Sequence, residues 1–363
     1  MDLLVALLVA GYAALRVVVR FVYVDLVYIS ALAYLAYSLG RLDLAAFSSV
    51  YILATVMVAK GKFTGQAGMA SALSYTGAIL ISSGLPHLQA LGFAMATMAP
   101  ALLLVTEADR GSLEGLFRYL VISTVVTNFL IIGLSTRGGT FGEFFILMAV
   151  IAEMGAAPLY VWVVDVYGRS SPAGLAALAS LPKLAAGFVL MYVAPELPPA
   201  AFYAVGAVSM LLGNLGALTS GDLRRVLAYS TVAHAGFALF AYPLSPAVSV
   251  LLILADAVGK MALFSHLSAG SARWPAVVMA MNQIGIPPAL GFWPKLLIIV
   301  LTAQHLGPVA AAYLLGNVVL SVPYYFRVAR DLPEGALRFP AAVAVFTTVA
   351  GAAAPLWLAA VLS

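Results

Sequence analysis

The feature that most constrains this chain is a regular series of apolar segments, each long enough to cross a lipid bilayer. A transmembrane helix needs about 20 consecutive, mainly apolar residues. Of the 363 residues, 64% are hydrophobic and only 9% are charged, whereas soluble domains typically contain about 25% charged residues. A fold with this composition needs lipid as a second apolar solvent, so we predict an all-α polytopic membrane protein.

Windows of this length predict about 14 transmembrane helices, joined by short loops that contain glycine, proline, serine and charged residues. No segment is long or polar enough to form an extramembrane domain. The first segment lacks a basic start and further apolar segments follow at once, so we interpret it as a retained span. Arg16 and Arg20 are expected to extend to the membrane surface. The predicted spans are 2–22, 24–40, 43–59, 66–84, 87–106, 113–134, 139–164, 171–193, 199–218, 223–242, 246–269, 275–303, 307–329 and 337–361.

The loop charges predict the orientation, because cytoplasmic loops carry an excess of Lys and Arg. Only Arg41 and Arg137 fall in even-numbered loops. We therefore predict a multi-pass protein of the cell (inner or plasma) membrane with both termini on the non-cytoplasmic side. The net charge of +4 comes from residues that flank spans, so no nucleic-acid partner is expected. Ten basic residues fall in odd-numbered loops: Lys60, Lys62, Arg110, Arg169, Arg224, Arg225, Arg273, Arg327, Arg330 and Arg338.

Five charged side chains cannot easily be placed in loops, namely Glu153, Lys183, Asp256, Lys260 and Lys295. A charge at the centre of a transmembrane helix costs about 2.5–3.5 kcal/mol, so such residues are functional candidates. Lys183 lies mid-span and cannot reach either surface. Asp256 and Lys260 are one turn apart, and their pairing within one helix is either structural or functional. His234 and His266 are weaker candidates, because a lone histidine in a span is often a hydrogen-bonded packing residue.

An internal repeat points to two interrupted helices. Residues 153–165 read EMGAAPLYVWVVD and residues 283–295 read QIGIPPALGFWPK, an offset of 130. A glycine and a proline within one span break the hydrogen-bond ladder and leave carbonyl groups free at membrane depth. Two such spans at equivalent places in two halves indicate an ion or substrate path. The residues that define the predicted broken helices are Gly155, Pro158, Gly285, Pro287 and Pro288.

Four sequence blocks resemble one known family and occur in its order and spacing. They are EMGAAPLYVWVVDVYGRSSPAGLAALASLPKLAAGF, GNLGALTSGDLRRVLAYSTVAHAGFALFA, NQIGIPPALGFWPKLLIIV and LLGNVVLSVPYYFRVAR. They are similar to blocks of the antiporter-like membrane subunits of respiratory complex I, most of all the N type of NADH-quinone oxidoreductase. Subunits of Mrp antiporters and membrane-bound hydrogenases belong to the same family. The first 90 residues match it only as generic spans.

The resemblance implies a division of the chain into four parts. Residues 1–65 would form three amino-terminal transmembrane helices, and residues 334–363 a carboxy-terminal one. Between them, residues 66–195 and 196–333 would form two five-helix bundles of inverted topology, each with one broken helix. In this family, buried lysines, histidines and waters relay protons along the membrane midplane.

Carried over residue by residue, the resemblance assigns roles to several of the buried groups. Lys183 takes the place of the central relay lysine of the eighth span, and Lys295 that of the lysine in the broken twelfth span. His234 matches the histidine of the tenth span. Lys260 matches the family lysine of the eleventh span, where Asp256 replaces a histidine that is usual in the hydrogenase and Mrp branch.

Three positions depart from the family pattern. The family has a lysine in the seventh span where this chain has Glu153, and the carboxylate that normally pairs with it aligns with Met95. Tyr160 stands where a histidine is usual. Because an acid buried without a counter-ion favours its protonated form, Glu153 could provide a carboxylate input for protons. Alternatively, the amino-terminal half-channel is inactive and the subunit is partly structural.

The predicted function is therefore ion translocation without redox chemistry. The absence of cysteine excludes cysteine-ligated zinc, iron–sulfur clusters and c-type haem in this chain, and no catalytic residue, metal or cofactor is predicted. The resemblance implies a subunit that moves H⁺ or Na⁺ within a complex-I-like or membrane-bound hydrogenase-like oxidoreductase, with other membrane subunits as partners. The alternatives are an Mrp-type antiporter subunit and a non-conducting structural subunit.

Overall fold

Within the residues that the computed structural model describes, namely 9–16, 19, 21–60, 68–107 and 109–362, the regular secondary structure is helical. Residues 9–16 form a short helical segment. The helices that follow are α2 (Val22–Ser38), α3 (Leu42–Lys60), α4 (Gly68–Ile81), α5 (Pro86–Ala101), η1 (Leu102–Glu107), α6 (Arg110–Ser135), α7 (Thr140–Met154), α8 (Val161–Arg169), α9 (Pro172–Leu178), α10 (Leu181–Tyr192), α11 (Pro199–Thr219), α12 (Leu223–Ala241), α13 (Pro246–Ala269), α14 (Arg273–Ile284), α15 (Phe292–His305), α16 (Pro308–Asp331) and α17 (Phe339–Leu362).

The helices confirm an all-α membrane protein. Six helical segments in the described part of the chain are long and apolar enough to cross a membrane: Pro86–Val105, Arg110–Ser135, Pro172–Tyr192, Pro199–Thr219, Pro246–Ala269 and Pro308–Asp331. Shorter apolar helices occur at Val22–Ser38, Leu42–Met57, Gly68–Ile81 and Phe339–Pro355. Three predicted spans, 139–164, 171–193 and 275–303, are each built from two separate α-helices. The count of 14 spans stays a prediction.

Local sequence signals explain where many of these helices begin. Proline opens α5, α9, α11, α13 and α16, where its missing N–H costs nothing and its fixed φ suits a helix. Asp109 caps α6 by accepting a hydrogen bond from the Ser112 N–H at 3.0 Å. Ser245 caps α13 by accepting one from the Val248 N–H at 3.3 Å. Helix starts were therefore set by proline and by short polar side chains in the loops.

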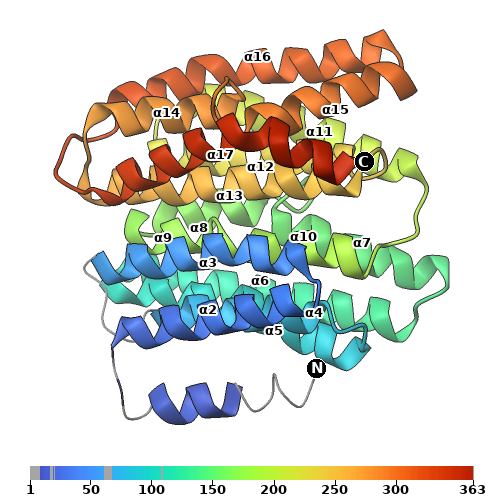
Figure 1. The fold of residues 1–363 in the computed structure, drawn as a ribbon. Coiled ribbons are helices and arrows are strands. Elements are labelled where there is room, and N and C mark those ends of the chain that lie inside the picture. The colour runs from blue at the N-terminus through green and yellow to red at the C-terminus, as the bar shows by residue number, and fades with distance from the viewer. Residues whose placement is uncertain (1–8, 17–18, 20, 61–67, 108, 363) are drawn as a thin grey trace.

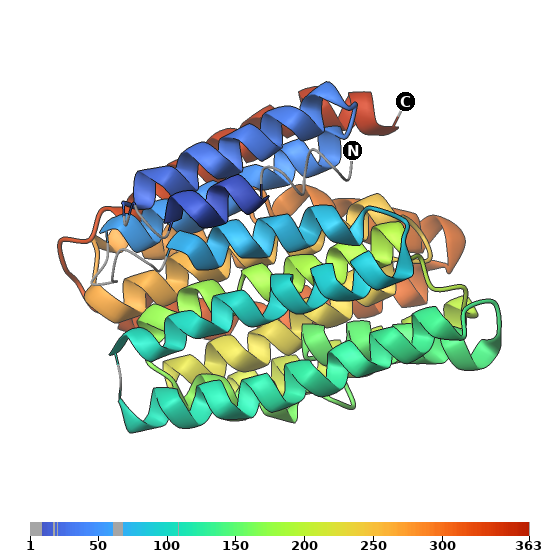
Figure 2. The same cartoon turned by 90° about the horizontal axis from the view of Figure 1, so that it is seen from below.

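The helices lie side by side with roughly parallel axes (Figure 1). Seen from below, α2 and α3 lie along the same face as α17, and α6 and α7 lie on the opposite face (Figure 2). α17 contacts α3, α13 and α14, so the carboxy-terminal helix lies beside a helix from the amino-terminal part of the chain. This arrangement encloses the helices from the middle of the chain.

The helices that carry the buried charges occupy this interior. In the Pro172–Tyr192 segment, which comprises α9 and α10, 94% of the apolar window is buried, and in α13 the value is 83%. The corresponding value for α6 and for α16 is only 33%. α13 packs against both α9 and α10, so side chains of these helices face one another inside the protein.

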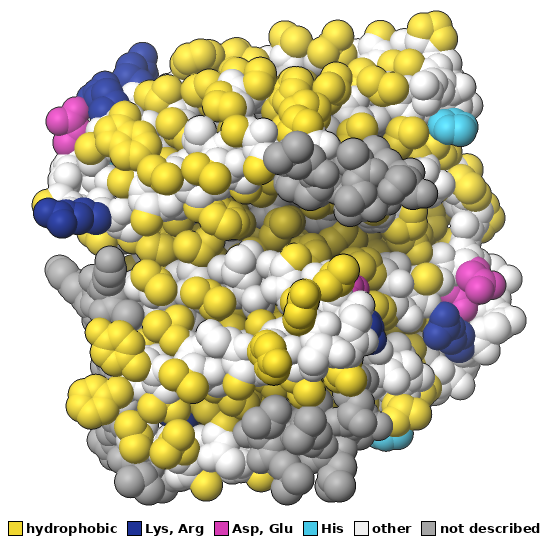
Figure 3. Space-filling model, viewed as in Figure 1, with side chains coloured by type: hydrophobic (Ala, Val, Ile, Leu, Met, Phe, Trp, Pro, Cys, Tyr) yellow, Lys and Arg dark blue, Asp and Glu magenta, His cyan; other side chains and the backbone are white. Residues whose placement is uncertain are grey.

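The outer surface suits contact with lipid. Large hydrophobic side chains are exposed on α6 and α16, including Phe117 (71% exposed) and Val309 (83% exposed). On the face shown in Figure 3, hydrophobic side chains cover the middle of the helices, and most charged side chains lie toward the helix ends. Exposure of apolar side chains to lipid costs no free energy, because lipid tails are equally apolar. This explains the high hydrophobic content of the chain.

The prediction that Arg16 extends to the membrane surface is wrong. Its side chain is buried, and its Nε lies 2.9 Å from Oδ1 of Asp25. The Tyr12 hydroxyl donates a hydrogen bond to the same oxygen at 2.6 Å. The fully buried carboxylate of Asp25, on the first turn of α2, attracts the guanidinium inward. Arg20 and Lys62 lie outside the described residues.

Candidate ion-translocation site

The site is built around two interrupted helices. α7 ends at Met154 and α14 ends at Ile284, and each is followed by a glycine in the left-handed region, Gly155 (φ 68°, ψ 37°) and Gly285 (φ 90°, ψ 52°). The chain resumes a helix only at the starts of α8 and α15. In each interruption one peptide bond before proline is cis: Ala157–Pro158 and Pro287–Pro288. The structure thus interrupts both helices at the residues that the repeat indicates.

The interruption after α14 creates the binding site for the Lys295 side chain. Within a continuous helix, the carbonyls of Gln283 and Ile284 would accept hydrogen bonds from residues 287 and 288, but both of these are proline and have no N–H. Lys295, buried on the first turn of α15, donates from Nζ to the carbonyl oxygens of Gln283 and Ile284, the latter at 3.1 Å. An ammonium group also suits the negative end of the α14 dipole.

We expect Gly285→Ala to disturb this site more than a matched change elsewhere. A Cβ at Gly285 would lie 2.8 Å from Cδ of Lys295, so the lysine side chain would have to move. The positive φ adds backbone strain of about 1–2 kcal/mol. Gly84→Ala is the control, because Gly84 also has a positive φ (76°) but no heavy atom lies within 4 Å of its added Cβ.

Both variants should lower the midpoint of thermal unfolding to a similar extent, and only Gly285→Ala should also reduce ion pumping. Equal pumping by the two variants would contradict a role for the position of Lys295.

A second group of buried side chains surrounds Asp256 on α13. Lys183 on α10 donates from Nζ to Oδ2 of Asp256 at 2.6 Å. Nζ of Lys260 lies 3.2 Å from Oδ1 of the same carboxyl group, and Nδ1 of His234 lies 3.7 Å from that oxygen. Asp256 therefore contacts three basic side chains from three helices, and the pairing with Lys260 expected from the sequence is only part of its environment.

Neutral groups complete the hydrogen bonding of the two lysines. Lys183 also donates to the Thr231 hydroxyl at 3.2 Å. Lys260 donates to the Ser230 hydroxyl at 2.6 Å and to the Tyr325 hydroxyl at 3.2 Å. These hydroxyls reduce the cost of burying the two ammonium groups, and among the described contacts of the two lysines only Asp256 carries an opposite charge.

His234 connects the Asp256 group to the broken helix. Its Nδ1 lies 2.8 Å from the carbonyl oxygen of Ser230, and its Nε2 lies 3.0 Å from that of Gln283. Lys295 donates to the same Gln283 oxygen. A neutral imidazole can donate from only one of its nitrogens, so only the protonated ring can donate to both carbonyls. Two ionisable groups thus share one carbonyl oxygen.

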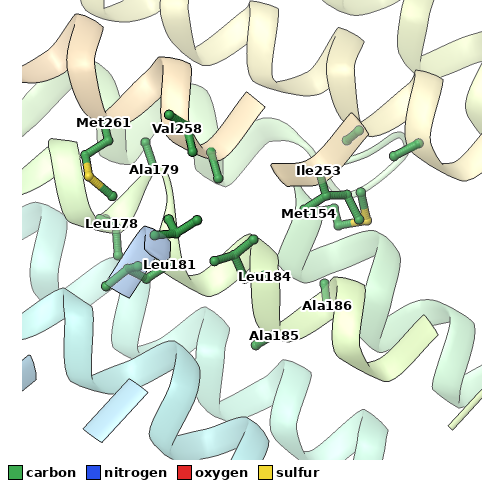
Figure 4. Close-up of a cluster of buried hydrophobic side chains, with 14 of the residues drawn as sticks. Met154, Leu178, Ala179, Leu181, Leu184, Ala185, Ala186, Ile253, Val258 and Met261 are labelled. Carbon is green, nitrogen blue, oxygen red and sulfur yellow. The ribbon is translucent and has the colours of Figure 1, made fainter. Parts of the chain in front are cut away.

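The surroundings of these charges are apolar. Figure 4 shows Leu181 and Leu184 of α10 and Ile253 and Val258 of α13 in one cluster of buried hydrophobic side chains. All four side chains are buried. A low-dielectric environment strengthens the attraction between Lys183 and Asp256 and makes an unpaired charge costly.

Glu153 lies in a separate environment at the end of α7. The Tyr119 hydroxyl lies 2.8 Å from Oε1 of Glu153 and 3.1 Å from the carbonyl oxygen of Thr97. The side chain is buried, and Oε2 has no hydrogen-bond partner. In the described part of the chain, no basic side chain forms an ion pair with Glu153. The Tyr119 hydroxyl thus links Glu153 to Thr97 of α5, and Met95 is only half-buried.

The two halves of the repeat differ most at Asp165, the counterpart of Lys295. Asp165 is part of an ion-pair network at the end of α8, where Arg118 lies 2.6 Å and Arg169 lies 2.7 Å from its carboxylate oxygens. Its side chain is 29% exposed. No cation therefore occupies the position after the first interruption that Lys295 occupies after the second.

Sequence reasoning missed several members of the site. Ser230 lies four residues and Thr231 three residues before His234, so all three share one face of a helix. This spacing could have predicted that the two hydroxyls belong to the site. Tyr325 and the Gln283 carbonyl carried no comparable signal, because their contacts depend on how α14 and α16 pack.

His266 hydrogen-bonds through Nε2 to the Pro333 carbonyl at 3.0 Å, as expected of a packing residue. Among the described residues, no three His, Cys, Asp or Glu side chains meet to form a metal site.

These features define a class of protein: a polytopic helical membrane protein with buried, paired lysines beside an interrupted helix. Residues 111–273 match the family described as NADH:quinone oxidoreductase/Mrp antiporter, transmembrane. The chain is thus similar to these antiporter-like membrane subunits, which confirms the resemblance seen in the sequence.

A named relative and two solved structures show how far the similarity extends. NADH-quinone oxidoreductase subunit N of Rubrobacter xylanophilus is 31% identical over 279 residues, which cover 61% of this chain and 58% of the relative. The chain thus spans less than two thirds of that relative's length. A chain of respiratory complex I from Thermus thermophilus has the same fold, with a TM-score of 0.82, 18% identity and 97% coverage of both chains. A chain of the Mrp complex from Dietzia has a TM-score of 0.78 and 15% identity, with 99% of this chain and 94% of that chain covered.

Proposed function

We propose that this protein translocates protons across the membrane as a subunit of a complex-I-like or membrane-bound hydrogenase-like oxidoreductase, without redox chemistry of its own. The observation that carries the proposal is the buried series of ionisable groups from Lys183 through Asp256 to Lys260 and His234, and from His234 to Lys295. Each member contacts the next directly or through a shared carbonyl oxygen.

Lysine suits such a series because its ammonium group can lose a proton when it is buried. Lys183 and Lys295 are the relay residues in this proposal, with Lys260 and His234 between them. Glu153 would provide the carboxylate input, since its Oε2 has no hydrogen-bond partner and is free to bind a proton. The other membrane subunits of the complex would supply the energy for transport and the neighbouring parts of the path.

The proposal includes an arrangement in the membrane. Residues 66–195 and 196–333 form two bundles of inverted topology, each containing one of the two interrupted helices. Residues 1–65 and 334–363 add spans outside them, for a total of about 14. The matching interruptions at Gly155 and Gly285 support a duplicated architecture. Both termini lie on the non-cytoplasmic side, because the basic loop residues favour the odd-numbered loops.

Cysteine labelling tests this topology, and the chain has no native cysteine that would interfere. We expect Arg224→Cys, in an odd-numbered loop, to be protected in intact cells from a membrane-impermeant maleimide. His305→Cys, in an even-numbered loop, is the control and should react. Both sites should react once the membrane is permeabilised. Labelling of Arg224→Cys from outside intact cells would refute the proposed orientation.

An Mrp-type antiporter subunit is the second candidate function. The similarity in fold to a chain of the Mrp complex favours it, as does the family description that residues 111–273 match. Purification of the native complex through a tag on this chain distinguishes the two candidates. Hydrogenase-like and iron–sulfur subunits in the complex would favour the first, and other Mrp subunits without redox subunits would favour the second.

The experiment that tests translocation measures ion uptake by inverted membrane vesicles that contain the assembled complex. Uptake by vesicles with the wild-type protein is compared with uptake by vesicles with the Lys183→Ala or the Lys295→Ala variant. Loss of uptake with normal assembly supports the proposal, whereas normal uptake by both variants would favour a non-conducting structural subunit.

A further inference from the structure

The carboxyl group of Asp256 is the point at which ionisable residues from α10 and α13 meet. Nζ of Lys183 lies 2.6 Å from Oδ2, and Nζ of Lys260 lies 3.2 Å from Oδ1, so each lysine contacts a different oxygen of one carboxyl group. No more than 6% of any of these three side chains is exposed. The group is therefore shielded from water inside the protein.

The charges in this group do not balance if both lysines are protonated. One carboxylate neutralises one ammonium, and the remaining contacts of Lys183 and Lys260 are to the neutral hydroxyls of Thr231, Ser230 and Tyr325. His234, at 3.7 Å, adds no negative charge. Because an uncompensated charge inside the membrane is unfavourable, the group is most stable with one charged lysine and one neutral lysine.

We infer that Asp256 is a shared counter-ion that makes the charging of Lys183 and Lys260 mutually exclusive, and thereby couples proton transfer between α10 and α13. This inference rests on the proposed function and assigns a role within it. When a proton moves from Lys183 to Lys260, one N–H bond of Lys183 breaks and one N–H bond of Lys260 forms. The carboxylate of Asp256 is ionised before and after this step. Asp256 is thus a positioning residue and not a proton carrier.

The departures of this chain from its family fit such a role. Met95 stands at the position of the fifth-span carboxylate, and Glu153 has replaced the seventh-span lysine, so this chain has no acid–lysine pair there. Asp256 restores an acid–lysine pair from another helix, with Lys183 as its closest partner. Its second contact, with Lys260, extends that pair toward the interrupted helix that holds Lys295.

The test compares two substitutions of Asp256 in the complex purified through a tag on this chain. Asp256→Asn keeps the shape but removes the charge, and we expect it to reduce pumping per assembled complex on the order of a hundredfold. Asp256→Glu keeps the charge and should restore pumping to well above the Asp256→Asn level. A purely structural role would change the amount of complex recovered but leave pumping per complex unchanged. Wild-type pumping by Asp256→Asn would overturn the inference.

A double variant covers the case in which Asp256→Asn does not assemble. Asp256→Asn combined with Lys260→Met removes one charge of each sign and leaves Lys183 free to remain neutral. Recovery of assembly, without recovery of pumping, is the expected result for a shared counter-ion. Failure of the double variant to assemble would contradict the charge-balance argument.

Lys183→Ala, measured in parallel, separates this inference from the proposed function. If Lys183→Ala abolishes pumping while Asp256→Asn does not, the shared counter-ion is excluded and the lysine relay stands. If neither variant affects pumping, the proposed function itself fails.

Discussion

Replacing Lys183 with alanine is expected to reduce proton pumping by on the order of a hundredfold while the complex still assembles, since an essential proton-carrying group typically contributes that much. The change removes the ammonium group that donates to Asp256 at 2.6 Å. Asp256 keeps a second cationic neighbour, Lys260 at 3.2 Å, so the substitution leaves no unpaired buried carboxylate. Assembly should therefore depend less on Lys183 than pumping does.

Two further variants identify the cause of the loss. Lys183→Arg keeps a positive charge beside Asp256, but a guanidinium does not release its proton at physiological pH, so pumping should also be lost. Arg330→Ala removes a cation that is exposed and pairs only with Asp331, and it should pump like the wild type. Normal pumping by both Lys183 variants would exclude Lys183 from the relay.

Glu153→Gln shows whether the unusual acid is part of the same path. Glutamine preserves the acceptor for the Tyr119 hydroxyl, which lies 2.8 Å from Oε1, but it cannot bind and release a proton. A pumping defect as large as that of Lys183→Ala would indicate that Glu153 is the proton input. Normal pumping would indicate that the first half-channel is inactive.

Replacing Lys295 with arginine is expected to produce the second large effect. Arginine keeps donors for the carbonyl oxygens of Gln283 and Ile284, so the end of α14 stays hydrogen-bonded. Because the guanidinium stays protonated, transfer beyond this point should stop and pumping should fall on the order of a hundredfold. The amount of assembled complex should match the wild type.

Lys295→Ala should instead impair both properties. It leaves the Ile284 carbonyl without its lysine donor, which costs about 1–3 kcal/mol for an unsatisfied buried group, whereas the Gln283 carbonyl keeps its contact with His234. The recovered complex should therefore be less stable to heat than the Lys295→Arg variant, in addition to pumping poorly. If Lys295→Arg pumps normally, Lys295 acts only as a helix cap and the path does not pass through it.

Much of the fold follows from local sequence features. Apolar windows of membrane length predict the helices, and the described part of the chain is helical in the predicted spans. The interruptions at Gly155 and Gly285 were also predictable, because glycine and proline act on the backbone where they stand. The buried charges could be located for a similar reason: a charged residue in the middle of an apolar segment cannot move away from it.

The partners of those charges were much harder to predict. The pairing of Asp256 with Lys260 follows from a spacing of four residues in one helix. Asp256 and Lys183, by contrast, are 73 residues apart and meet only because α10 packs against α13. In the same way, the Tyr119 hydroxyl contacts both Thr97 and Glu153 only because α5 and α7 each pack against α6.

The sequence by itself thus determined that the protein is a helical membrane protein, where two of its helices are interrupted, and that Glu153, Lys183, Asp256, Lys260 and Lys295 are buried, although it did not predict the burial of Arg16 and Asp25. These properties depend on hydrophobicity and on backbone chemistry, which act over one helix or less. Only the tertiary structure decided that Asp256 serves two lysines and that one carbonyl of Gln283 contacts both His234 and Lys295. Contacts of this kind join distant segments, so they are set by the packing and rotation of whole helices.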